Sequence, residues 1–269
     1  MTTVTGRYRA PMPHSRIPYG PHHGQAGDLW RPADAAGDLP LVVLIHGGFW
    51  RAQFTKALMG RLARAVVERG WAAWNIEYRR LGALGGGGGW PQTFQDVADA
   101  VDQVAHFSGI DQDRVATCGH SAGGTLALWA AGRHRLGADA PGASVKVNVR
   151  GAVSLAGVVD LAAAAGSAVG GDVVAKLLGG ANAEVRQQRM AMASPAALLP
   201  LGVPQILIHG LDDTTVPPSM SERYVGQAVA AGDDARYIPL PGVGHREVID
   251  PRNLAWEAAS THLAALFDS

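Results

Sequence analysis

Short apolar runs recur along the chain, separated by longer segments whose apolar residues follow helical spacing. Five of the runs are rich in β-branched residues, which is typical of strands buried on both faces of a sheet. These predicted strands cover residues 41–45, 72–76, 115–118, 149–155 and 205–208, and a sixth strand is predicted at residues 235–240.

The segments between the runs predict helices, one of which begins directly after Ser121. The predicted helices cover residues 52–69, 93–107, 122–134, 173–178, 183–192, 219–231 and 253–267. Strands that alternate with helices imply right-handed crossovers, so we predict an α/β fold with a mostly parallel central sheet flanked by helices. Ligands of such sheets bind beyond the carboxyl ends of the strands, where the connecting loops should line one cleft.

The chain has 269 residues, of which 47% are hydrophobic and evenly spread, and this favours one domain over residues 1–269. Residues 160–201 break the alternation, because they carry helical segments without an obvious strand. We predict a small helical lid there, and a long crossover connection is the alternative. The glycine run at residues 85–89 predicts a flexible surface loop near the cleft.

The charge balance excludes several classes of partner. The 23 basic and 23 acidic residues form no block of like charge, so neither a nucleic acid nor a membrane is an expected partner. No apolar run approaches the roughly 20 residues that cross a bilayer, and residues 1–20 lack the apolar stretch of a signal peptide. We therefore expect a cytoplasmic protein with a small, weakly charged ligand, and homodimer formation stays open.

Neither cysteine nor histidine indicates a cofactor. Cys118 is the single cysteine, and the ten histidines occur without an H-E-x-x-H motif. No internal disulfide, metal site or cofactor is therefore expected.

The motif G-H-S-A-G surrounds Ser121 and follows a predicted strand. This G-x-S-x-G frame suits a sharp turn from strand to helix, in which glycines allow close backbone packing while the serine projects its hydroxyl. A serine hydroxyl is a poor nucleophile without a neighbouring base and a third group that orients the base. The motif thus predicts that Ser121 is the nucleophile of a serine hydrolase.

His245 is the predicted general base, because it follows the last predicted strand within P-G-V-G-H-R. His209 and His120 also end strands, and we interpret both as structural. The acid should lie between serine and base in an α/β hydrolase, where the residues offer the doublet Asp212 and Asp213.

The chain here resembles the α/β-hydrolase superfamily, in which H-G-x-x-D-x-x-V-P after a core strand holds the acid. The resemblance implies Asp213 as the acid, with Asp212 as the alternative. The matching residues are His209, Gly210, Asp213, Val216 and Pro217.

The motif H-G-G-F-W at residues 46–50 predicts an oxyanion hole. Its glycines allow backbone amides to turn inward, so the predicted donors are the N–H groups of Gly48, Phe49 and, beside the nucleophile, Ala122. Phe49, Trp50 and Trp90 offer aromatic surface for a planar leaving group, and core packing is the alternative for each.

H-G-G-x-W is similar to the signature of kynurenine formamidases and of esterases near the hormone-sensitive-lipase group. The resemblance implies a hydrolase of small carboxylic esters or N-formyl aryl amides that acts through an acyl-enzyme. An aminopeptidase-like serine peptidase and a non-catalytic small-molecule receptor are the alternatives.

Overall fold

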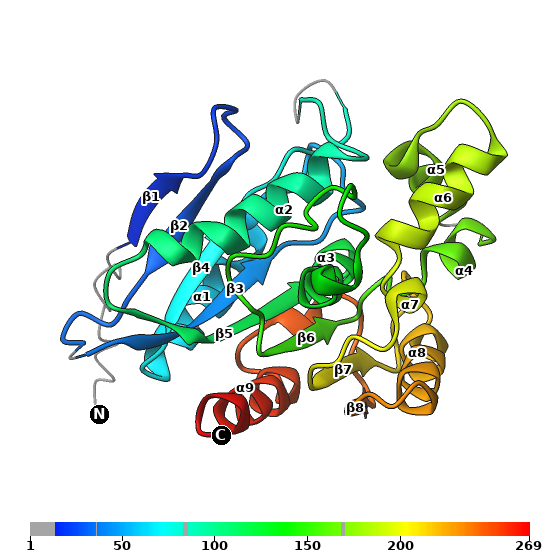
Figure 1. Cartoon of the computed structure of the whole chain (residues 1–269). Helices are drawn as coiled ribbons and strands as arrows, with labels where there is room; N and C mark the ends of the chain where they lie inside the picture. The colour runs from blue at the N-terminus through cyan, green and yellow to red at the C-terminus, as the bar shows by residue number, and fades with distance from the viewer. Residues whose placement is uncertain (1–13, 36, 83–85, 168–169) are drawn as a thin grey trace.

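Eight strands of the described chain form one sheet in the computed structural model, in the order β1-β2-β4-β3-β5-β6-β7-β8 (Figure 1). The structure describes residues 14–35, 37–82, 86–167 and 170–269, so the predictions for residues 1–13 and Gly85 lie outside it. The first two strands are antiparallel to their neighbours, and the other pairs are parallel. The strands are β1 (His14–Pro18), β2 (Ala26–Trp30), β3 (Leu39–Ile45), β4 (Ala72–Ile76), β5 (Ile110–His120), β6 (Gly151–Leu155), β7 (Gln205–Gly210) and β8 (Ala235–Leu240).

The predicted α/β fold with a mostly parallel sheet is confirmed, and all six predicted strands are present. The added hairpin of β1 and β2 was not predicted, because Gly27 and Asp28 interrupt the apolar pattern of β2. Gly27 is required there by packing, since a Cβ would lie 2.5 Å from the indole of Trp74.

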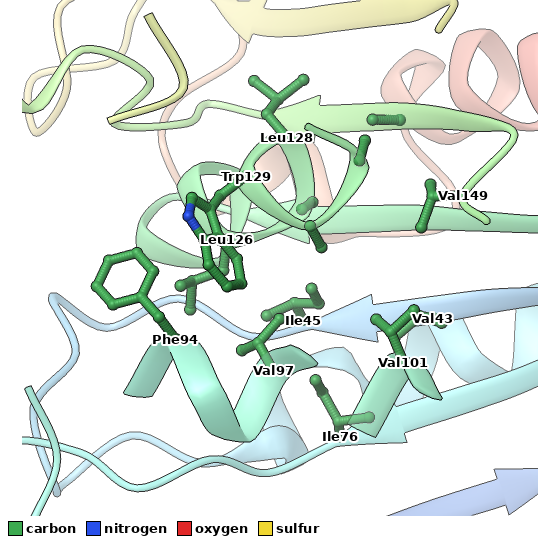
Figure 2. Close-up of a cluster of buried hydrophobic side chains, with 14 of the residues drawn as sticks. Val43, Ile45, Ile76, Phe94, Val97, Val101, Leu126, Leu128, Trp129 and Val149 are labelled. Carbon is green, nitrogen blue, oxygen red and sulfur yellow. The ribbon is translucent and has the colours of Figure 1, made fainter. Parts of the chain in front are cut away.

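Alternate residues of β3 point into two separate cores. Val43 and Ile45 pack on one face, beneath α2 (Gln92–Asp102) and α3 (Ala122–Ala131), as Figure 2 shows. Val42 and Leu44 pack on the other face, against α1 (Gly60–Glu68) and α9 (Leu254–Phe267). This alternation is the expected consequence of the strand's period of two, and it explains why β3 is apolar throughout.

The predicted helix at residues 52–69 starts later than expected. Ala52 N–H donates to the carbonyl of Leu81, and only a 3-10 turn (Lys56–Met59) precedes α1. This bond to the segment that follows β4 holds the backbone before the turn in a non-helical conformation, although its apolar residues follow helical spacing.

Residues 160–201 lie between β6 and β7, and the described part of that segment contains four helices. The first three cluster together, and the fourth lies beside α8 (Pro218–Ala230) (Figure 1). The side chain of Asp160 accepts from two N–H groups at the start of the first, which begins the segment with a helix cap. The helices are α4 (Leu161–Ala165), α5 (Gly171–Leu178), α6 (Ala183–Ala193) and α7 (Pro195–Leu198). That this segment acts as a lid stays a prediction.

No helix within the described residues is both long and apolar enough to cross a membrane.

Candidate active site

Ser121 lies at the sharp turn between β5 and α3. Its backbone has φ 54° and ψ −119°, a left-handed conformation that is rare for a residue with a side chain. The two motif glycines are required by contact: a Cβ on Gly119 would lie 1.9 Å from the carbonyl oxygen of Gly123, and one on Gly123 would lie 2.1 Å from that of Ile45. The strained turn therefore exists because both positions lack a side chain.

Three loops bring Ser121, His245 and Asp213 into one hydrogen-bonded row. Nε2 of His245 lies 3.0 Å from Oγ of Ser121, and Nδ1 of His245 lies 2.6 Å from Oδ2 of Asp213. The loops follow β5, β8 and β7, which are parallel and end at the same edge of the sheet. A serine hydroxyl beside an imidazole that contacts a carboxylate can be activated as a nucleophile.

The carboxylate of Asp213 is fully enclosed by donors. Its Oδ1 accepts the N–H groups of Thr215 at 2.8 Å and Val216 at 2.9 Å, while Oδ2 faces both His245 and His209. Burial raises the pKa of Asp213, but hydrogen bonds from His209, His245 and the Val216 N–H together hold that pKa well below its usual value. These hydrogen bonds therefore favour the carboxylate form of Asp213.

Asp212, the sequence alternative, is exposed and makes no side-chain hydrogen bond within the described residues. Its backbone N–H donates to the carbonyl of Val243. The geometry thus favours Asp213.

The glycine-rich loop after β3 lies against the serine. A Cβ on Gly47 would lie 2.9 Å from Cβ of Ser121, and Gly48 has φ 113°, which favours glycine. The N–H groups of Gly48 and Phe49 donate to no partner among the described residues. Ala122 is the first residue of α3, where amides have no intrahelical acceptor. The glycine loop and the start of α3 thus hold three amides without an acceptor among the described residues, and their role as oxyanion donors stays a prediction.

Of the two interpretations of Trp50, substrate contact and core packing, its burial favours core packing. Its side chain is 1% exposed and packs in the core, while its carbonyl accepts the N–H of Leu81 at 2.7 Å. Phe49 is partly exposed, and its role as a substrate contact stays a prediction. Trp90 packs against Phe94 with ring centroids 5.2 Å apart.

A buried brace that the motifs did not reveal holds the glycine loop. Nε2 of His46 lies 2.7 Å from Glu77, and Nδ1 of His46 lies 2.8 Å from the carbonyl of Gly47. Tyr78 stacks on the His46 ring at 4.4 Å and donates its hydroxyl to the His46 carbonyl. Although burial raises it, the pKa of Glu77 is lowered by the His46 hydrogen bond, so a carboxylate anchors this loop. Glu77 follows a predicted strand, but nothing in its local sequence indicates this contact.

His120 precedes the serine and braces the neighbouring loop. Its Nε2 lies 2.8 Å from the carbonyl of His245, and the two rings are 4.8 Å apart. Burial and the nearby His245 lower the pKa of His120 to about 3, so its ring is neutral and Nε2–H donates to the carbonyl. His120 therefore supports the backbone of His245, in agreement with its interpretation as structural.

A small apolar hollow borders the site. Its walls include Phe49 and Val158, and the N–H of Val158 donates to the carbonyl of Ser121 at 3.3 Å. Val216 and Met220 also line the hollow, and the cavity volume is about 20 Å³. That volume accommodates little more than one water-sized group.

No cluster of three or more histidine, cysteine, aspartate or glutamate side chains within the described ranges could hold a metal ion.

Comparison with known proteins identifies relatives of this arrangement. The BD-FAE family model matches residues 28–227, which include Ser121 and Asp213. The kynurenine formamidase of Danio rerio is 30% identical over 149 residues, which are 54% of this chain and 46% of that protein. Esterase LipQ of Mycobacterium tuberculosis is 32% identical over 167 residues, which are 56% of this chain and 38% of that protein. The chain thus spans about half the length, or less, of these curated relatives.

Solved structures share the fold over nearly the whole chain. A truncated carbohydrate esterase from gut microbiota superposes with a TM-score of 0.80 at 21% identity, covering 97% of this chain and 99% of that one. Esterase B from Lactobacillus rhamnosis superposes with a TM-score of 0.78 at 21% identity, covering 94% of this chain and 85% of that one. The family match covers well over half of the sequence, so the chain belongs to the BD-FAE family and has the α/β-hydrolase fold.

Proposed function

We propose that this protein is a serine hydrolase that cleaves small carboxylic esters or N-formyl aryl amides through an acyl-enzyme. The observation that carries the proposal is the unbroken row from Asp213 through His245 to Ser121, at 2.6 and 3.0 Å. The kynurenine formamidase and the esterases among its relatives support the same chemistry.

In this mechanism, Oγ of Ser121 attacks the carbonyl carbon while Nε2 of His245 takes the hydroxyl proton. Asp213 keeps the His245 ring in the tautomer that can accept this proton and stabilises the imidazolium that results. His245 then gives the proton to the departing alcohol or amine, which leaves an ester of Ser121. Water attacks this ester with His245 again as the base, and the acid product leaves.

The amides of Gly48, Phe49 and Ala122 stabilise the negative oxygen of both tetrahedral intermediates. Each such donor contributes about 10²–10³-fold to turnover when it is preorganised. The His46–Glu77 brace supplies that preorganisation, because it fixes the carbonyl of Gly47, next to the first donor.

The proposed substrates have a short acyl group, since the hollow between Phe49 and Met220 has little free volume. We expect kcat/KM for p-nitrophenyl esters to be highest between formate and butyrate and to fall for longer chains. A buried methylene contributes about 0.8 kcal/mol only where space exists to bury it. A maximum at octanoate or longer would contradict this, and would indicate an acyl tunnel within residues 160–201.

We expect kcat/KM for simple esters to rise with pH in a single step. Activity rises rather than falls, because only a neutral His245 accepts the serine proton. Asp213 adds no second step, since its hydrogen bonds hold its pKa well below its usual value. The measurement is a pH–rate profile with and without a chelator. Loss of activity with the chelator, restored by zinc, would contradict the mechanism.

The substrate class is tested with purified protein on short and long p-nitrophenyl esters, N-formylkynurenine and aminoacyl anilides. The proposal predicts turnover of short esters or of the formamide that depends on Ser121. Turnover of the aminoacyl anilides alone would contradict it and would favour a serine peptidase.

A further inference from the structure

A second buried histidine contacts the carboxylate of Asp213. His209 is fully buried at the end of β7, and its Nε2 lies 3.1 Å from Oδ2 of Asp213 and 3.0 Å from the carbonyl oxygen of Val216. On the other side of the ring, Nδ1 lies 2.7 Å from Oγ of Ser221, which is itself buried in α8. Both ring nitrogens are therefore used.

These contacts fix the position of the proton on His209. Nε2 faces a carboxylate and a carbonyl, which only accept hydrogen bonds, so Nε2 carries the proton. Ser221 can donate its hydroxyl proton to Nδ1, and with Nε2 as the donor to Asp213 this arrangement defines one tautomer of the ring.

Oδ2 of Asp213 consequently accepts two imidazole donors, from His245 at 2.6 Å and from His209 at 3.1 Å. Each donor that stabilises the carboxylate weakens it as an acceptor for the other. The strength of the contact between Asp213 and His245 therefore depends on a residue that never touches the substrate.

We propose that His209, with its tautomer fixed by Ser221, is a positioning residue of the reaction: it holds Oδ2 of Asp213 toward His245 and limits how strongly Asp213 favours the protonated form of His245. The inference rests on the proposed function, because it assigns His209 a part in the same proton transfer. It differs from the interpretation from sequence, which treated His209 as structural.

The substitutions in the test leave the other titratable residues near Asp213, His245 and Ser121 in place. His120 is neutral, with its pKa lowered by burial to about 3, and Asp213 is ionised throughout. Arg246 and Glu247 lie on the His245 loop, and Asp212 is exposed beside Asp213. None of them is altered by the substitutions below.

The test compares four variants. His209→Leu removes the donor, and His209→Gln retains an N–H at a similar distance along the side chain. Ser221→Ala removes only the group that fixes the tautomer, and it is the milder variant if His209→Leu folds poorly. Ser219→Ala is the matched control, because Ser219 lies one half-turn away in α8 and its hydroxyl accepts from the exposed Arg223.

Two readouts are taken on each variant: the pH profile of kcat/KM and the titration of the His245 ring in ¹⁵N-histidine NMR spectra. We expect His209→Leu to lower kcat/KM about tenfold and to move both midpoints to higher pH by about half a unit, since the carboxylate then favours the imidazolium more strongly. Ser221→Ala should move them in the same direction by less. His209→Gln should return them toward wild type, and Ser219→Ala should leave them unchanged.

Unchanged midpoints in both His209→Leu and Ser221→Ala, accompanied only by a lower melting temperature, would overturn the proposal and leave His209 a packing residue. Failure of His209→Gln to restore the midpoints would also overturn it. The NMR titration needs no substrate, so it decides the role of His209 even if the wild-type protein cleaves none of the esters. Absence of turnover would instead contradict the proposed function.

Discussion

Replacement of Ser121 by alanine is expected to lower kcat/KM for short esters by at least about 10⁴-fold. The substitution removes the hydroxyl that lies 3.0 Å from Nε2 of His245, while the amides of Gly48 and Phe49 remain. Its effect on the free energy of unfolding should be within about 1 kcal/mol, because alanine and serine tolerate the left-handed backbone of this turn about equally and little volume is lost.

A matched control is Ser154→Ala in the adjacent strand β6. Ser154 is also fully buried, but its Oγ has no hydrogen-bond partner among the described residues. The control should retain activity, whereas retention of activity in Ser121→Ala with the same melting temperature would exclude Ser121 as the nucleophile.

Asp213→Asn is expected to lower kcat by about 10⁴-fold, through the tautomer of His245. The asparagine oxygen can still accept from Thr215 and Val216, which then directs its NH₂ group toward His245. Facing a donor, the ring must carry its proton on Nε2, where it cannot take the proton of Ser121. Steady-state kinetics on a short p-nitrophenyl ester measures this loss.

Asp212→Asn is the matched control, because it makes the same change at the adjacent position. Asp212 is exposed and lies outside the hydrogen-bonded row, so less than a threefold change is expected, the scale of about 0.6 kcal/mol in a rate. A larger loss in Asp212→Asn than in Asp213→Asn would show that the acid lies at the other position of the doublet.

The fold could largely be predicted from sequence because its central strands are buried on both faces. An apolar run such as that of β3 packs against a core on each face of the sheet, so its residues are apolar in succession. This pattern differs from the helical spacing of the segments on either side. The hairpin of β1 and β2 lies at the sheet edge. Its β1 is mostly exposed, and β2, although buried, carries Gly27 and Asp28 within its apolar pattern. The helices α4 and α7 have five and four residues, too short to show a helical period.

The residues of the candidate site also fall into two groups, those that local sequence predicts and those that it does not. Ser121, His245 and the glycine loop occur in local motifs whose backbone geometry demands particular residues, so sequence spacing reveals them. Glu77 and Ser221 act across tertiary contacts with His46 and His209, and no local pattern marks such contacts. Trp50 belongs to a motif, but its burial depends on the neighbouring Leu81 segment, which the motif does not contain.

The central claim, that Ser121 is the nucleophile of an acyl-transfer reaction, is tested most directly by labelling with a fluorophosphonate followed by peptide mass spectrometry. The account predicts one adduct, on the peptide that contains Ser121, with labelling absent in Ser121→Ala and strongly slowed in His245→Ala. Undiminished labelling of Ser121→Ala, or an adduct on another residue in the wild-type protein, would contradict it.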